Sequence, residues 1–166
     1  MRKLIGLIFG GAKHNVAQMA SAASLRDAKA AYVCGDYATA LRLWRPLADQ
    51  GNARAQFNLG IMYINGEGVA QNYKEAAKWL RLAADQGIAD AQYSLGSMYE
   101  RGLGLVQDYV RAHMWYNLAA SADSEQVGKI ATKNRDGLAA KMTPTHIAQA
   151  QEMAKRCQQS NFKDCD

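Results

Sequence analysis

The sequence contains little proline and no long apolar run. Only two of its 166 residues are proline while 14 are glycine, which argues against a disordered linker and favours helices joined by glycine turns. A transmembrane anchor needs about 20 consecutive apolar residues. The sequence has no run of that length, so we expect no such anchor. The chain is long enough for one domain with a core of its own.

A strong excess of charge is also missing outside the first 22 residues. The formal net charge is +5, and Arg2, Lys3 and Lys13 contribute three of these charges with no acid among them, which leaves +5 − 3 = +2. Nucleic-acid binding needs a clustered basic face. We therefore expect no nucleic-acid partner.

Recognised catalytic and metal-binding motifs are missing as well. His14, His113 and His146 have no second His, Cys or acid at a metal-ligand spacing. Two Gly-x-Gly loops, at 66–68 and 102–104, follow expected helices and lack a Gly-Lys-Ser/Thr, so they predict turns with positive φ rather than phosphate sites. We expect no cofactor, no metal and no catalytic residue, and hence no enzyme.

Residues 1–22 look like a secretory signal peptide. A basic start at 1–3 precedes an apolar run at 4–9, and Ala-Ser-Ala at 20–22 forms a cleavage pattern. Lys13 departs from that pattern. We predict export to the periplasm or out of the cell, and a cytoplasmic chain with a poorly ordered N-terminus is the alternative.

What the sequence does contain is an internal repeat with a period of 36 residues (91 − 55). The segment Ala55–Gly87 recurs in register from Ala91, and a fixed period of this size indicates a repeat architecture. The matching pairs are Leu59 and Leu95, Gly60 and Gly96, Tyr63 and Tyr99, Tyr73 and Tyr109, Ala76 and Ala112, and Trp79 and Trp115. We expect both tryptophans to pack in the core.

Each complete unit is expected to hold two helices. In the first helix, Leu59 and Met62 fall on one face, and Gly60 would let the neighbouring helix approach closely. Asn72 predicts the start of the second helix, and Glu75 three residues later completes the pattern of a capping box.

The two ends of the chain deviate from this unit. Near the N-terminus only the second helix matches, where Pro46 predicts a kink and Gly51 a helix end. Near the C-terminus two further helices, the second beginning at Pro144, are expected to cap the stack. The expected organisation is a signal peptide at 1–22, a degenerate tetratricopeptide-like helix pair at 23–52, complete repeats at 53–88 and 89–124, and capping helices with a tail at 125–166.

The pattern Ala-x-x-x-Leu-Gly-x-x-Tyr-x-x-Gly-x-Gly, followed by Tyr-x-x-Ala-x-x-Trp, resembles the Sel1-like repeat, a relative of the tetratricopeptide repeat. The resemblance covers roughly residues 25–122. It implies an all-α protein, an α/α solenoid, that acts as a protein-interaction scaffold. Bacterial members of the family are often exported.

Certain cysteine-rich relatives have been linked to β-lactam binding, which supplies a second hypothesis. Residues 160–163 match the Ser-x-x-Lys pattern of penicillin-interacting enzymes, but neither Lys-Thr-Gly nor Ser-Asp-Asn is present. An envelope enzyme acting on cell wall or β-lactam is therefore the weaker alternative to a non-enzymatic scaffold. A cytosolic adaptor is a third.

The three cysteines divide into a pair and a single residue. Cys157 and Cys165 lie close together near the C-terminus and, in an exported protein, would form a disulfide that pins the tail to the last helix. Free thiols in a cytosolic chain are the alternative. Cys34 has no basic neighbour to lower its pKa, and we expect it to be a small buried residue.

The first helices of stacked pairs line the concave face of such a solenoid. Alignment with the tetratricopeptide pattern places a mixed aromatic, apolar and charged set there, as expected for a groove that binds an unidentified peptide or protein. The candidate residues are Arg54, Phe57, Ile61, Ile64, Tyr93, Ser97 and Glu100. Packing of Phe57 and Tyr93 against the neighbouring helix is the alternative.

Overall fold

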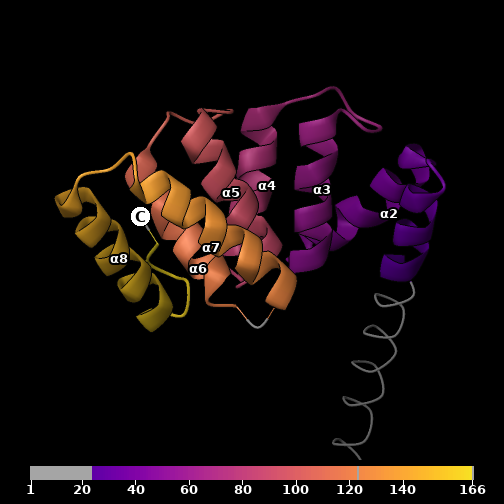
Figure 1. Ribbon diagram of the computed structural model, residues 1–166. Helices are drawn as coiled ribbons and strands as arrows, with labels where there is room; N and C mark the ends of the chain where they lie inside the picture. The colour runs from indigo at the N-terminus through magenta and orange to yellow at the C-terminus, as the bar shows by residue number, and fades with distance from the viewer. Residues whose placement is uncertain (1–23, 123, 166) are drawn as a thin grey trace, which may run out of the picture.

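A computed structural model describes residues 24–122 and 124–165, and their regular structure is entirely helical (Figure 1). The predicted signal peptide lies outside the described residues. The helices are residues 24–33, α2 (Tyr37–Asp49), α3 (Ala53–Asn65), α4 (Tyr73–Ala84), α5 (Ala89–Arg101), α6 (Tyr109–Ala120), α7 (Glu125–Ala139) and α8 (Pro144–Gln159).

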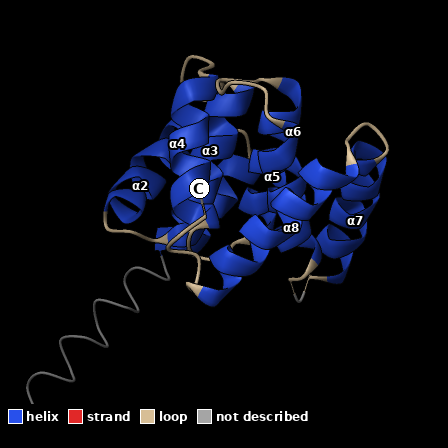
Figure 2. Cartoon of the chain, turned by 90° about the vertical axis from the view of Figure 1, so that its left-hand side faces the viewer, coloured by secondary structure: helices blue, strands red, loops and turns tan. Residues whose placement is uncertain are grey.

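The helices stack in chain order. From α2 to α7 each helix packs against the next, α7 also contacts α5, and α8 returns to pack against α6. Figure 1 shows the resulting row, which runs from α2 at one end to α8 at the other, and Figure 2 shows the same stack from its side. The predicted all-α solenoid is confirmed.

Glycines inside the first helices allow the paired helices to approach closely. A Cβ at Gly60 would lie 2.6 Å from Cγ of Leu80, and one at Gly96 would lie 2.7 Å from Cδ1 of Tyr116. Any side chain at these positions would therefore push α4 away from α3, or α6 away from α5. The predicted role of Gly60 is confirmed, and it recurs one period later.

The Gly-x-Gly loops are turns, as predicted, and they connect neighbouring units. Gly66 and Gly68 have φ of 72° and 69°, the left-handed region that glycine adopts without strain. A Cβ at Gly68 would lie 3.0 Å from the carbonyl oxygen of Tyr37, the first residue of α2. Each loop thus packs against the start of the second helix in the preceding unit.

The helix ends follow the predicted chemistry in part. The Asn72 side chain accepts a hydrogen bond from the N–H of Glu75, as expected of an N-cap. The second half of the capping box is wrong: the Asn72 N–H donates to the carbonyl of Tyr63, and the Glu75 carboxylate pairs with Lys78. The Tyr63 carbonyl on α3 thus accepts the hydrogen bond that the Glu75 carboxylate was expected to accept.

Helix α2 ends where the sequence predicts. Gln50 is its C-cap, and Gly51 follows with φ of 91°. The helix is continuous through Pro46, and the kink expected there stays a prediction. At the other end of the chain, Thr143 caps α8 and Pro144 occupies its first turn.

The core combines alanines with leucine, methionine and large aromatic side chains. Trp115 is fully buried and Trp44 almost so, whereas Trp79 is half-buried against the cluster formed by α2 and α3. The expectation of a buried Cys34 is wrong, because this free cysteine is exposed. Cys34 lies at the turn that directly follows the first helix, and Ala70 and Val106, one and two periods later, are exposed as well.

Candidate interaction surface

Four of the predicted binding residues lie on α3. Arg54 is exposed, while Phe57, Ile61 and Ile64 are half-buried. Phe57 and Ile64 also pack against the core cluster formed mainly by α4, α5, α6 and α8. This side of α3 therefore presents apolar surface that the chain covers only in part.

The three predicted residues on α5 are more strongly engaged. The hydroxyl of Tyr93 accepts a hydrogen bond from Nδ2 of Asn134 on α7 at 3.0 Å, and its ring centroid lies 5.6 Å from that of Tyr116. Glu100 accepts a hydrogen bond from the Tyr116 hydroxyl at 2.8 Å. Ser97, which lies between Tyr93 and Glu100 in the sequence, is half-buried.

Helix α7 explains why the predicted binding residues on α5 make more contacts than those on α3. It packs against α6 and α5, and the ammonium of Lys141, just after it, lies 3.9 Å from the Glu100 carboxylate. Packing of Phe57 and Tyr93 against neighbouring elements, the alternative raised by the sequence, is thus what the structure contains. Arg54 is the exposed member of the predicted set, and the three apolar residues on α3 are each half-buried.

Two arginine–tryptophan contacts, which sequence reasoning missed, recur between units. The guanidinium of Arg45 lies 5.5 Å from the ring centroid of Trp79, and that of Arg81 lies 5.1 Å from Trp115. The two arginines are 36 residues apart (81 − 45), and so are the two tryptophans (115 − 79). The period itself was the signal that could have revealed this cation–π pair.

Two buried glutamines recur in the same way. Nε2 of Gln56 donates to the carbonyl of Ala48, and Nε2 of Gln92 donates to that of Ala84. Each amide ties the first helix of one unit to the end of the second helix before it. These side chains therefore join neighbouring units.

A cavity of about 360 Å³ lies between α4 and α5, beneath the loop that follows α5. The sequence did not predict it. It is lined by Lys74, Ala77, Lys78 and Arg81 of α4, by Leu95 and Tyr99 of α5, and by Gly104 and Leu105 of the loop.

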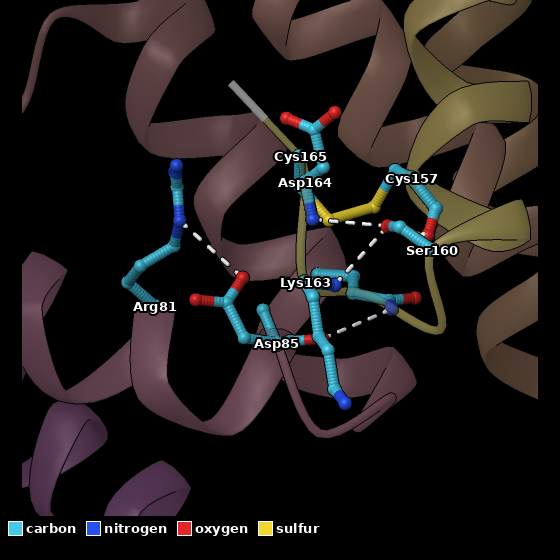
Figure 3. Close-up of a disulfide and its surroundings, with 9 residues drawn as sticks. Arg81, Asp85, Cys157, Ser160, Lys163, Asp164 and Cys165 are labelled. Atoms are coloured by element: carbon cyan, nitrogen blue, oxygen red, sulfur yellow. Dashed lines mark hydrogen bonds and ion pairs between the residues drawn. A yellow bond between two sulfur atoms is a disulfide. The ribbon is translucent and has the colours of Figure 1, made fainter.

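The C-terminal tail folds back onto the stack. Cys157 and Cys165, the predicted pair, are joined by a disulfide with their Cα atoms 4.5 Å apart (Figure 3). Phe162 reaches the turn after α4, where a Cβ at Gly87 would lie 3.2 Å from its ring. The tail thus joins the cap to the second unit.

Ser160, the serine of the Ser-x-x-Lys pattern, has a structural use in this tail. Its hydroxyl donates to the carbonyl of Cys157 and accepts from the N–H groups of Lys163 and Asp164 (Figure 3). These bonds close the turn that leads to the disulfide. The geometry adds no support to the enzyme hypothesis.

The shifted side-chain pKa values have structural causes. Burial, strengthened by the hydrogen bond to Glu100, raises the pKa of the Tyr116 hydroxyl. Burial likewise raises the pKa of Tyr32 to about 12, with Glu67 as its hydrogen-bond partner. Burial lowers the pKa of His113, and nearby Arg135 acts in the same direction. The two phenols therefore stay neutral and act as hydrogen-bond donors: Tyr116 joins α6 to Glu100 on α5, and Tyr32 joins the first helix to Glu67 in the loop after α3.

The structure bears on clusters of metal-ligand side chains and on membrane-spanning helices only for the residues that it describes. Residues 24–122 and 124–165 contain no group of three or more His, Cys, Asp or Glu side chains that could hold a metal ion. No helix within these ranges is both long and apolar enough to cross a membrane.

The model of the Sel1 repeat family matches residues 29–52, 53–88 and 89–124. Among solved structures, a protective antigen of uropathogenic Escherichia coli with an SLR fold is similar, with 30% identity and a TM-score of 0.78 over 86% of this chain. A Sel1 repeat protein from Oxalobacter formigenes has 33% identity and a TM-score of 0.58 over 63% of this chain. No curated protein matches significantly.

Both of these solved proteins are much longer than the segment of them that this chain matches. The chain spans 31% of the Escherichia coli protein and 41% of the Oxalobacter formigenes protein. Similarity therefore extends to a stack of repeats within each of them.

Proposed function

Because the chain belongs to the Sel1 repeat family, whose fold is typical of protein–protein interaction scaffolds, we propose that it binds a partner protein or peptide through the concave face formed by its first helices. The observation that carries this proposal is the half-exposed apolar side of α3. Ile61 and Ile64 are only partly covered there, and Arg54 is exposed beside them. Apolar anchors next to a charged side chain are typical of peptide grooves.

The α5 half of the same face has a supporting role in this proposal. Tyr93 and Glu100 are held by contacts with α6, α7 and Lys141, so they shape the wall of the groove, and Ser97 contributes a small polar position beside them. The partner would thus make most of its contacts with Arg54, Phe57, Ile61 and Ile64.

We further propose that the protein acts without catalysis in the bacterial periplasm or after secretion. The disulfide between Cys157 and Cys165 supports an oxidising compartment, and the leader-like residues 1–22 support export. N-terminal sequencing of the protein purified from its native cells tests this. A mature chain that begins near residue 23 is expected, and an intact Met1 would end the export proposal.

Affinity capture with matched variants tests the binding face. The double variant Arg54→Glu/Ile61→Ser should lose most of the partner recovered by the wild type, because it removes an apolar anchor and reverses a charge. Lys133→Gln, at an exposed position on α7, is the matched control and should recover the partner fully. A folded double variant that recovers the partner as well as the wild type would contradict the proposed face.

A further inference from the structure

We propose that the cavity between α4 and α5 is a second binding site, which takes an acidic segment of a partner protein with an apolar side chain next to its carboxylate. This inference rests on the proposed function, since it names the chemistry of a partner, but it concerns a different surface. The groove on α3 could exist without it.

The walls of the cavity suit an apolar side chain. Ala77 and Leu95 belong to the core cluster, and Leu105 packs against that cluster from the loop above. A volume of about 360 Å³ exceeds what one leucine or phenylalanine side chain needs. An apolar group that enters this space is removed from water, which is favourable at about 25 cal/mol per Å² of buried surface.

The charged residues at the cavity are all cationic. Lys74, Lys78 and Arg81 follow one another at i, i+4 and i+7 along the side of α4 that lines it. Lys78 pairs with Glu75, and Arg81 pairs with Asp85 (Figure 3). Neither of these acids lines the cavity, so the charged side chains of the lining itself are all positive.

Two polar groups of the lining have no partner of their own. Lys74 makes no ion pair with any residue that the structure describes, and the Tyr99 hydroxyl makes no hydrogen bond there. An ammonium and a phenolic O–H are both donors for a carboxylate, and hydrogen bonds to charged groups are the strong ones. The site is therefore matched to an anionic acceptor rather than to a cationic or neutral one.

The preceding junction, between α2 and α3, has a different arrangement of the equivalent side chains. Between α2 and α3, Nη2 of Arg45 donates to the hydroxyl of Tyr63 at 2.7 Å and bridges the two helices. The equivalent Arg81 is drawn to Asp85 instead, with Nε 3.4 Å from the carboxylate, so the equivalent Tyr99 keeps an unused hydroxyl. In place of Lys74 the earlier unit has Ala38 (74 − 36).

Fluorescence anisotropy with purified protein tests the proposal. The probe is a pool of fluorescein-labelled octapeptides that carry Asp or Glu next to Leu or Phe, and the comparison pool carries Asn or Gln in place of the acids. We expect the acidic pool to bind the wild type at least about tenfold more tightly than the amide pool, and the difference to shrink as salt is raised.

Variants separate this site from the groove on α3. Lys74→Gln and Tyr99→Phe, which remove only a charge and a hydroxyl, should each weaken binding of the acidic pool about tenfold. Lys133→Gln and Arg54→Glu/Ile61→Ser should leave it unchanged. Thermal unfolding of each variant verifies that it is folded.

Either of two results would overturn the inference: equal binding of the two pools, or full binding by folded Lys74→Gln and Tyr99→Phe. Both results would leave the groove on α3 untouched, because that groove is tested by partner capture. Loss of partner capture in Arg54→Glu/Ile61→Ser together with unchanged peptide binding would support both sites as separate surfaces.

Discussion

Gly104 lies directly against the backbone of Tyr73: a Cβ at Gly104 would be 2.4 Å from the Tyr73 carbonyl carbon. The equivalent distance one period earlier, from a Cβ at Gly68 to the Tyr37 carbonyl carbon, is longer at 3.1 Å. The loop of the third unit is thus seated on the first turn of α4, where it also covers the cavity. Because Gly104 has no side chain, the loop of the third unit can lie this close to the second unit.

Gly104→Ala is therefore expected to destabilise the protein strongly. Gly102→Ala is the matched control, because Gly102 has a similar φ of 67° but its nearest contact to a Cβ would be 3.5 Å. Strain in the left-handed region should lower the free energy of unfolding of both variants by about 1–2 kcal/mol. The backbone clash should cost Gly104→Ala about 1–3 kcal/mol more. Urea unfolding measures the difference, and equal losses would contradict the tight contact.

Gln92→Met tests the glutamine that joins two units. The substitution keeps the length of a side chain that is 1% exposed but removes its hydrogen bond to Ala84. We expect a loss of about 0.5–1.5 kcal/mol in the free energy of unfolding. Gln151→Met, at an exposed position on α8, should change it by less than about 0.5 kcal/mol. If the two variants were equally stable, the amide would not join the units.

The disulfide should contribute to stability by restricting the unfolded tail. Cys157 and Cys165 are eight residues apart, for which the chain-entropy relation gives about 2.5 kcal/mol. Cys157→Ala/Cys165→Ala should lose about that much in denaturant unfolding, and reductant should lower the stability of the wild type only. Cys34→Ser, at an exposed position, should leave stability unchanged. A reductant effect that persisted in the double alanine variant would refute this assignment.

His113 should make stability depend on pH on the acid side. It is 3% exposed, and burial together with Arg135 lowers its pKa below the usual 6.5, while Asp136 opposes this. Above pH 6.5 the imidazole is neutral in the folded and unfolded chains, so no penalty arises. As pH falls below 6.5 the unfolded chain binds the proton first, and the free energy of unfolding decreases until pH passes the lowered pKa of the folded state.

Thermal unfolding between pH 7.5 and pH 5 measures this contribution. His113→Leu should have a flatter dependence of Tm on pH than the wild type, whatever its absolute stability. His146→Gln, at an exposed position in α8, should keep the slope of the wild type. A His113→Leu protein with the full slope would show that other groups cause the acid-side loss.

Much of the fold could be predicted because its determinants are local. The period of 36 residues and the glycines at 60, 66 and 68 specify helix pairs, close packing and turns within one unit. The predicted hydrogen bond from the Asn72 N–H to the Glu75 side chain does not form, because the Asn72 N–H donates to the carbonyl of Tyr63 instead. Burial of Cys34 was predicted from its residue type, whereas its exposure follows from its place in the turn between two helices, as for Ala70 and Val106 one and two periods later.

The candidate site was predicted less completely than the fold. Helical periodicity placed Arg54, Ile61 and Ile64 on one side of α3, but it did not indicate that α7 would engage Tyr93 through Asn134, 41 residues away in the sequence. Contacts of this kind depend on how the capping helices dock, which the repeat pattern does not encode.

Helix periodicity, capping residues and glycine turns act within a few residues of one another, so the stack of helix pairs could be inferred from the order of the amino acids alone. Which surfaces stay open depends on how these helices pack together. Arg81 pairs with Asp85 whereas the equivalent Arg45 bonds to Tyr63, and Arg81 is one of the residues that line the cavity. The accessibility of a side chain depends on the distant segments that pack against it, whereas the formation of the helix that carries it depends mainly on neighbouring residues.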